Sequence, residues 1–584
     1  MKPIHVILYV LLTLLVLAIL SFLGLFLIVR GLSDTEPVVE GNSTLVITLA
    51  GAIPEHTAAS DFPLHISKAT NMKDILDNIE KAKADRRIKG ILLKINANLM
   101  GWAKVEEIRQ KLIDFKSSGK YVIAYLGSYV SEKEYYTALA ADSVFAVPGG
   151  FLEMNGLVIE TVHLPGLFEK LGISLEYFAF GKYKSHSGET YGRKKHTEPV
   201  LEMLNDLLDQ EYNTLVNGIA TRWNISPSEV TAVIDKGYIR AEKFRELGWL
   251  TGILYEDQLF ERLKQLNHEG LHRQLNQITS ETYSDITMES LGLNKGKDRI
   301  ALIYSQGIVQ EGDDTVSLLS MEQSAGTTPI IQAIRRAAKS KSVKAIIFRV
   351  DSPGGSGLGC DLVWREILEA KKIKPVIVSM SDYAASGGYW ISMGATAIVA
   401  QPTTLTGSIG IWGIFPDLSG LYDKLGLVEE NVKRGQYADM MLFTKKMSSH
   451  EKELYRDYIQ STYHEFVSKA AASRGKAYEE LEPYTQGRSW MGTQAKQFGL
   501  IDELGGLDRA IEIAREKAQI DTSASIKVVV YETQKSLIDR LLSDPFGLVQ
   551  SGLNQGNLGS AVQSFLNKQR VFIWPMMPYS FRIQ

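Results

Sequence analysis

The sequence predicts an α/β protein built from two tandem copies of one βα domain with additional helices, preceded by one N-terminal transmembrane helix. Two observations carry this prediction. The segment Lys120–Gly150 realigns on Lys374–Thr404, an offset of 254 residues (374 − 120) that holds without a gap for more than sixty residues. In both copies short apolar runs alternate with amphipathic stretches, which is the pattern of parallel βα units.

The N-terminal segment predicts a membrane anchor. Val6–Val29 is uncharged and apolar over 24 residues, and as a helix it would extend about 36 Å, enough to span a bilayer with some tilt. No small-residue cleavage motif follows it, so we expect an uncleaved signal anchor and then a polar stalk that ends at residue 42. After Arg30 the next basic residue is Lys68, which favours a position of the remaining chain outside the cytoplasm.

Behind the anchor we expect a first repeat at 43–266, a linker at 267–298, a second repeat at 299–530 and a tail at 531–584. Each repeat should begin with a strand and contain a buried parallel strand after its first helix. A long helical region should follow in each repeat. These elements are Thr44–Glu55, Ile88–Ile95 and Leu201–Trp223 in the first repeat, and Arg299–Gly312 and Val343–Val350 in the second. The apolar end of the tail is too short to span a membrane, so we expect it to dock on the core or on another subunit.

Composition excludes several classes of function. The net charge of −3 gives no sign of a nucleic-acid partner. Cys360 is the single cysteine, which excludes an intramolecular disulfide. The ten histidines are scattered and have no partner cysteines, so we expect neither a metal site nor a cofactor.

A glycine pair follows the buried strand of the second copy, in the motif DSPGGS at Asp351–Ser356. Gly354 and Gly355 would let the backbone turn sharply and present N–H groups that could stabilise the oxyanion of an acyl-transfer intermediate. A simple strand-to-helix turn is the alternative. The first copy weakens that alternative, because the matching strand there ends in NANLMGW without a glycine pair.

Two serines are candidate nucleophiles. Ser386 lies among small residues in YAASGGYW, at an expected helix start, and Glu132 occupies its place in the first copy. Close helix–sheet packing would also explain those small residues. Ser408 lies in LTGSIGIWG and faces Met154 of the first copy.

A lysine is the candidate base, since no histidine stands out for that role. Lys184, in GKYKSHSGET of the first copy, faces Ala438 of the second. A lysine can take the proton of a serine if desolvation lowers its pKa. On composition alone it would be a solvated charge. One copy therefore keeps a serine and the other keeps a lysine, as expected for two domains that share one catalytic site.

At these motifs the sequence resembles the signal peptide peptidase A family in its long, duplicated, membrane-anchored form. The resemblance covers nearly the whole chain, including the ending Met491–Ile511. It implies a Clp/crotonase-like fold in both repeats and a serine protease with a Ser/Lys dyad. On the family's pattern Ser408 is the nucleophile, Lys184 is the general base, and the oxyanion donors are Gly354 and Gly355, with Gly355 preferred. Ser386 would be an accessory residue, although in the related Clp proteases the nucleophile occupies a similar place. The basic segment SHSGETYGRKKH after the lysine departs from the family's pattern and leaves the local groove wall open.

The resemblance further implies a single-pass protein of the bacterial inner membrane that degrades released signal peptides and other apolar peptides. It also implies a homo-oligomer, a tetramer by family resemblance. Two alternatives stay open: a catalytically inactive ring-forming scaffold, and a crotonase-type acyl-CoA enzyme. The membrane anchor and the lack of acid/base carboxylates near the glycine loops disfavour the acyl-CoA enzyme.

Overall fold

The computed structural model describes residues 36–57, 70–270, 274–314, 324–521 and 524–532, together with Thr13, Leu17 and Ser21. The predicted anchor at 6–29 therefore lies outside the described residues apart from those three. The predicted tail lies outside them apart from residues 531 and 532. Among the helices that are described, none is long and apolar enough to cross a membrane.

The first repeat is built on a six-stranded sheet in which every pairing is parallel, in the order β10-β1-β2-β3-β5-β9. Its central strands are buried on both faces, which explains their continuous apolar sequences. Its elements are β1 (Ser43–Gly51), α2 (Met72–Ala84), β2 (Ile88–Asn98), α3 (Trp102–Lys116), β3 (Tyr121–Leu126), β4 (Tyr129–Val130), α4 (Glu132–Ala138), β5 (Ser143–Ala146), β6 (Phe151–Met154), α5 (Pro165–Leu171), β7 (Ser174–Phe180), α6 (His186–Gly192), α7 (Glu198–Trp223), α8 (Pro227–Ile234), β8 (Tyr238–Arg240), α9 (Ala241–Glu246), β9 (Gly252–Ile253) and α10 (Glu256–Leu266).

The second repeat is built on an eight-stranded sheet with the path β19-β17-β15-β14-β11-β21; off this path, β16 pairs with β15 and β20 pairs with β16. All its pairings are parallel except β17 with β19. Its elements are β11 (Asp298–Gln306), β12 (Ile308–Gln310), β13 (Ser324–Gly326), α12 (Thr327–Lys339), β14 (Val343–Ser352), α13 (Gly357–Lys371), β15 (Val376–Ala385), α14 (Gly387–Trp390), β16 (Ala397–Ala400), β17 (Leu405–Gly407), β18 (Ile411–Asp417), α15 (Ser419–Leu425), α16 (Ser449–Ser473), α17 (Tyr478–Leu481), a 3₁₀ turn (Glu482–Tyr484), β19 (Ser489–Met491), α18 (Gly492–Gln497), β20 (Glu503–Leu504), α19 (Leu507–Lys517) and β21 (Ile526–Val530).

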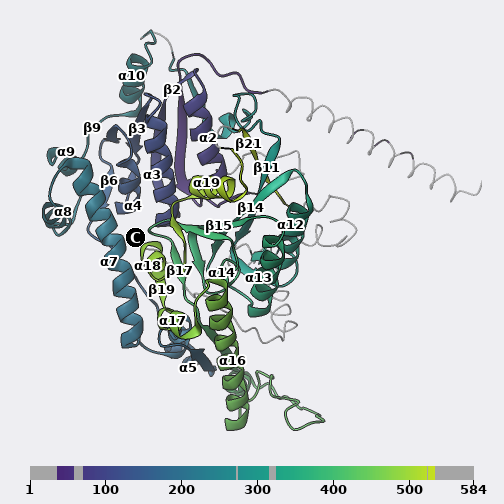
Figure 1. Cartoon of the computed structure of the whole chain (residues 1–584). Helices are drawn as coiled ribbons and strands as arrows, with labels where there is room; N and C mark the ends of the chain where they lie inside the picture. The colour runs from purple at the N-terminus through teal and green to yellow at the C-terminus, as the bar shows by residue number, and fades with distance from the viewer. Residues whose placement is uncertain are drawn as a thin grey trace, which may run out of the picture.

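The predicted α/β class and the tandem duplication are confirmed. The strand–helix–strand unit β2-α3-β3 recurs as β14-α13-β15, and Figure 1 shows the two repeats side by side, the first in purple and blue and the second in green. The range expected to be a linker contains β10 (Gln277–Thr279), which pairs with β1, and α11 (Ser280–Tyr283). Buried Asn78 donates to Ser280 Oγ there, so specific polar contacts hold this patternless stretch onto the first repeat.

A strand pair joins the two repeats. β7 of the first repeat and β18 of the second run antiparallel, from Phe180 opposite Ile411 to Ser174 opposite Asp417. We call this pair and its flanking helices α5 and α15 the joint. Each strand exists in only one copy, because the equivalents of β7 and β18 at the repeat offset, 428–434 and 157–163, form no strand in the described structure.

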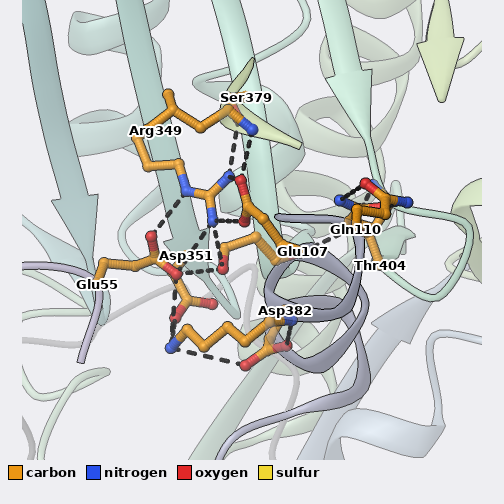
Figure 2. Close-up of polar contacts among 12 residues, drawn as sticks. Glu55, Glu107, Gln110, Arg349, Asp351, Ser379, Asp382 and Thr404 are labelled. Carbon is orange, nitrogen blue, oxygen red and sulfur yellow. Dashed lines mark hydrogen bonds and ion pairs between the residues drawn. The ribbon is translucent and has the colours of Figure 1, made fainter. Parts of the chain in front are cut away.

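A buried network of charges also joins the repeats, and Figure 2 shows it. The Arg349 guanidinium, on β14, lies between Glu55 and Glu107 of the first repeat, with Nε 2.7 Å from Glu55 and Nη2 2.5 Å from Glu107. Lys104 of the first repeat reaches Asp351 at 2.8 Å and Asp382 at 3.6 Å. Both basic side chains are buried, so these ions are desolvated and depend on one another.

Carboxylates of this network also cap helices across the two repeats: in each repeat, one helix start is capped by a side chain of the other repeat. Asp382 of the second repeat accepts hydrogen bonds from the Gly101 and Lys104 amides at the start of α3 (2.8 and 3.0 Å). Glu107 of the first repeat accepts from the Leu507 amide at the start of α19. Each helix begins after a glycine without a capping side chain of its own, so these carboxylates satisfy amides that would otherwise have no partner.

Candidate active site

The centre of the candidate site is Lys184, in the turn between β7 and α6. Its side chain is fully buried, and Nζ lies 2.8 Å from Ser386 Oγ, 3.0 Å from Ser408 Oγ and 3.0 Å from the Ser408 carbonyl oxygen. Burial lowers the pKa of Lys184 well below its ordinary value. No carboxylate of the described structure forms an ion pair with it. The lysine of one repeat thus meets both candidate serines of the other.

The joint explains how the lysine reaches this position. β7 ends at Phe180, four residues before Lys184, and its partner β18 begins three residues after Ser408. Two glycines leave room for the lysine: a Cβ on Gly410 would lie 2.9 Å from Lys184 Cδ, and one on Gly487 would collide with Lys184 Cβ. The second glycine of the GSIG motif is therefore needed for the lysine.

Ser386 occupies a sharp turn from β15 into α14. Its backbone has φ 57° and ψ −114°, a conformation that costs free energy for a residue with a Cβ and is typical of functional sites. Its carbonyl accepts the first helical hydrogen bond from Trp390 N. A strained strand-to-helix turn that presents a serine hydroxyl is the geometry of the nucleophile elbow.

Ser408 lies between β17 and β18 and is held from both sides. Its amide donates to the Arg488 carbonyl at 2.7 Å, and its carbonyl oxygen faces Lys184 Nζ. Its φ of 50° is also positive. Because the Ser408 amide is already engaged, it cannot serve as an oxyanion donor at this serine.

The glycine loop lies against the residue that follows Ser386. Gly354 has φ +124°, and Gly355 forms a parallel bridge with Val309. That bridge uses the Gly354 carbonyl and the Ser356 amide, so the Gly355 amide points to the other side. A Cβ on Gly387 would lie 2.8 Å from Gly355 N. The Gly355 amide nitrogen therefore lies beside Gly387, the residue that follows Ser386.

The matching place in the first repeat holds no nucleophile. Glu132, at the Ser386 position, accepts hydrogen bonds from the Asn155 and Gly156 amides at 2.8 and 2.9 Å. Met154, at the Ser408 position, is fully buried, and Ala438, at the Lys184 position, is exposed. A carboxylate and a thioether have thus replaced the two serines.

Sequence reasoning missed several residues that hold the site together. The Gln486 carbonyl accepts from the Tyr183 amide at 2.8 Å, and the Gly487 amide donates to Ile409, so the segment before β19 ties the lysine turn to the serine turn. The signal in the sequence is weak, a single glycine in TQGRS. Neighbouring His186 is fully buried, and burial lowers its pKa to about 3. It is therefore neutral.

Comparison with known proteins places these motifs in context. The model of peptidase family S49 matches residues 114–269 and 369–521, one segment in each repeat. The chain is 37% identical over 506 residues to "Serine protease SPPA, chloroplastic" of Arabidopsis thaliana, covering 86% of this chain and 73% of that protein. It is 30% identical over 498 residues to "Protease 4" of Haemophilus influenzae (82% and 79%). It is 29% identical over 245 residues to "Putative signal peptide peptidase SppA" of Enterococcus faecium (42% and 71%).

Proposed function

The chain belongs to peptidase family S49, and from that premise we propose that it is a serine peptidase in which Ser386 and Lys184 form the catalytic dyad. The observation that carries the proposal is the buried amine of Lys184, 2.8 Å from Ser386 Oγ. A lysine that loses its proton on burial is a base able to activate a serine. Supplying that base from the first repeat would give the duplicated chain one working site.

This assignment exchanges the roles that the sequence suggested for the two serines. Three observations support Ser386 as the nucleophile: its strained strand-to-helix turn, its contact with the lysine, and the position of the Gly355 amide nitrogen beside Gly387, the next residue. Ser408 offers a hydroxyl and a carbonyl oxygen to the same amine. A neutral amine has two N–H groups and one lone pair. Donation of both N–H groups to Ser408 would turn the lone pair towards the Ser386 hydroxyl.

The reaction then follows from the geometry. Ser386 Oγ attacks the peptide carbonyl carbon while its proton passes to Lys184 Nζ. The new oxyanion accepts hydrogen bonds from the Gly355 and Gly387 amides. Lys184 returns the proton to the leaving amine as the C–N bond breaks, and an acyl-enzyme ester remains. A water then attacks that ester, with Lys184 again taking the proton, and releases the acid and free Ser386.

For substrate and location we propose signal peptides and other apolar peptides, cleaved next to a membrane that the segment Val6–Val29 anchors. The apolar length of that segment supports the anchor. The names of the relatives, a signal peptide peptidase among them, support the substrate class. By the same likeness to bacterial relatives, we propose a single-pass protein of a bacterial inner membrane whose peptidase lies outside the cytoplasm.

The test is acylation by a serine-directed reagent, followed by peptide mapping of the labelled residue. We expect label on Ser386 in the full chain and none in Ser386→Ala or Lys184→Met. Ser386→Ala should lose peptidase activity by roughly 10³-fold or more. Ser408→Ala should keep the label site and lose roughly tenfold to hundredfold, the effect of one hydrogen bond to a charged group. Label on Ser408 instead would restore that serine as nucleophile, and no label with no hydrolysis would favour the scaffold alternative.

A further inference from the structure

A cavity of about 40 Å³ lies between the two repeats. The first repeat lines it with Trp102 of α3, Lys133 of α4 and Glu211 of α7, and the second lines it with Tyr383 of β15 and Leu405 of β17. Most of its walls are apolar. Lys133 and Tyr383 are partly exposed, so the rim of the cavity reaches the molecular surface.

Three polar groups of residues that line the cavity have no hydrogen-bond partner in the described structure. They are Trp102 Nε1, Thr403 Oγ1 and Glu211 Oε2. The three residues are buried, with 5%, 7% and 7% of their surface accessible. A buried polar group without a partner lowers stability, and native structures contain few of them. Three such groups around one cavity therefore indicate a ligand with complementary donors and acceptors.

The other two charged residues of the cavity are already engaged. Asp382 accepts hydrogen bonds from two amides at the start of α3, at 2.8 and 3.0 Å, and Lys133 donates to the Met100 carbonyl. Burial raises the pKa of Glu211 to about 8, so its carboxyl is mostly protonated at neutral pH. The groups that have no partner are thus uncharged, and a ligand that satisfies them needs hydrogen bonds and no charge.

The cavity lies close to the candidate active site. Tyr383 and Leu405 pair across β15 and β17, and each precedes a candidate serine by three residues. Three strand residues span about 10 Å. Tyr183 and Ala385, which directly precede the two members of the proposed dyad, pack in the same apolar cluster as Leu405. An extended peptide bound at the dyad would therefore bring a side chain to the cavity from a residue about two or three positions away from the cleaved bond.

We propose that this cavity is a subsite for a carboxamide side chain of the substrate peptide, glutamine or asparagine; the inference rests on the proposed peptidase function. The carboxamide oxygen accepts hydrogen bonds from the Trp102 N–H and the Thr403 hydroxyl, and the carboxamide NH₂ group donates to the Glu211 carboxyl. Each of the three unpartnered groups then has a partner. The apolar walls surround the methylene part of the side chain.

Other side chains fit these three groups less well. An aliphatic side chain or a methionine leaves the polar groups unpaired. The ammonium group of a lysine has no acceptor for the Trp102 N–H. A carboxylate accepts hydrogen bonds, but it brings a second negative charge next to Asp382 in a cavity with mostly apolar walls. Trp102, Thr403 and Glu211 are therefore specificity-determining residues in this proposal and take no part in the bond cleavage.

Competition between substrates of similar shape tests the subsite. Apolar peptides that carry glutamine, methionine or glutamate at one position are hydrolysed in the same mixture, and that position is moved along the peptide in a series of such mixtures. The product ratio gives the ratio of the kcat/KM values. At one position glutamine should be preferred over methionine and over glutamate by roughly tenfold or more, because only the carboxamide makes all the hydrogen bonds without a charge.

Variants of the lining residues connect that preference to the cavity. Thr403→Val removes the unpartnered hydroxyl at nearly constant volume, and Glu211→Leu removes the carboxyl; each should reduce the glutamine-to-methionine ratio roughly tenfold. Glu211→Gln keeps a carbonyl oxygen for the substrate NH₂ group and should keep the ratio. Asp209→Asn and Thr221→Val change exposed side chains of α7, the helix that carries Glu211, and are the matched controls. The melting temperature of Thr403→Val should not fall, because the lost hydroxyl has no partner in the described structure.

The possible results separate the subsite from the peptidase function. Hydrolysis of glutamine and methionine peptides at equal rates, whatever the position, would refute the subsite alone. A glutamine preference that survives both Thr403→Val and Glu211→Leu would place the selective groups elsewhere and also overturn the subsite. A large fall in the melting temperature of Thr403→Val would show that the hydroxyl serves the fold and not a substrate. Absence of hydrolysis of every peptide would refute the peptidase function, and the subsite with it.

Discussion

At the scale of single residues, the site depends on one lysine that is costly to bury. Lys184 is fully buried without an ion-pair partner in the described structure, and desolvation alone accounts for its lowered pKa. In the unfolded chain the same side chain is protonated up to about pH 10.4. Burial therefore makes the folded chain hold this proton less tightly than the unfolded chain does, and burying the lysine costs the protein stability.

We predict that Lys184→Met abolishes peptidase activity and stabilises the fold. The folded-state pKa is depressed, so between the folded and unfolded values the unfolded chain binds the extra proton, and the parent chain gains stability as pH rises. The Lys184→Met variant has no such titrating group, so this pH-dependent loss of stability is absent from it. Its advantage in melting temperature should be largest near pH 6 and should shrink towards pH 10. A variant that is less stable than the parent chain at pH 6 would show that the hydrogen bonds to Ser386 and Ser408 outweigh desolvation.

At the scale of elements, the strand ends that carry the site are supported by the other repeat. Asp351 is the next-to-last residue of β14, before the turn that carries Gly354 and Gly355. Its carboxylate accepts from the Tyr383 amide at 3.1 Å and from Lys104 Nζ at 2.8 Å. The β14–β15 ladder is interrupted between Val350 and Ser352. The Asp351 side chain replaces the missing ladder contact, and Lys104 neutralises it.

We predict that Lys104→Met lowers both stability and turnover. It leaves Asp351, Asp382 and Glu55 without their shared cation, and loss of one partner of a buried ion pair costs about 3–5 kcal/mol. Chemical denaturation should show that loss. The matched control is Lys83→Met, whose partner Asp114 is half exposed, and which should cost at most about 1 kcal/mol. If the two variants lost equal free energy of unfolding, the buried network would contribute no more stability than a surface ion pair.

The elements that follow local patterns were predictable, and those that depend on distant partners were not. Apolar runs in the sequence predict β2 and β14 nearly to their ends. The pairing of β7 with β18 was not predictable, because it joins segments more than 200 residues apart whose counterparts in the other repeat form no strand in the described structure. The sequence also brought Ser386, Ser408 and Lys184 forward as candidates. The resemblance ranked Ser408 as the nucleophile and Ser386 as accessory, whereas the exchange proposed above rests on a backbone angle and on which amides are already bonded, neither of which the sequence shows.

At the scale of the whole molecule, the two repeats are unequal halves of one site. The second contributes both serines and the glycine loop, and the first contributes Lys184, Lys104 and the carboxylates around Arg349. Both Lys184 contacts with the serines lie within one chain. In an assembly of many chains, each site would therefore be complete in itself.

We predict that mixing inactive chains does not restore activity. The two variants, Ser386→Ala and Lys184→Met, are coexpressed, or dissociated and reassembled together. In the Ser386→Ala chain the lysine then has no Ser386 hydroxyl to deprotonate, and in the Lys184→Met chain Ser386 has no base. The second repeat carries Ala438 at the position of Lys184, so it cannot supply a base in place of the missing lysine. Hydrolysis of an apolar reporter peptide should stay at the level of the separate variants, with a mixture of parent and Ser386→Ala chains as the control for assembly. Recovery of activity in the variant mixture would require Lys184 to cross between chains, which the pairing of Phe180 with Ile411 in one chain opposes.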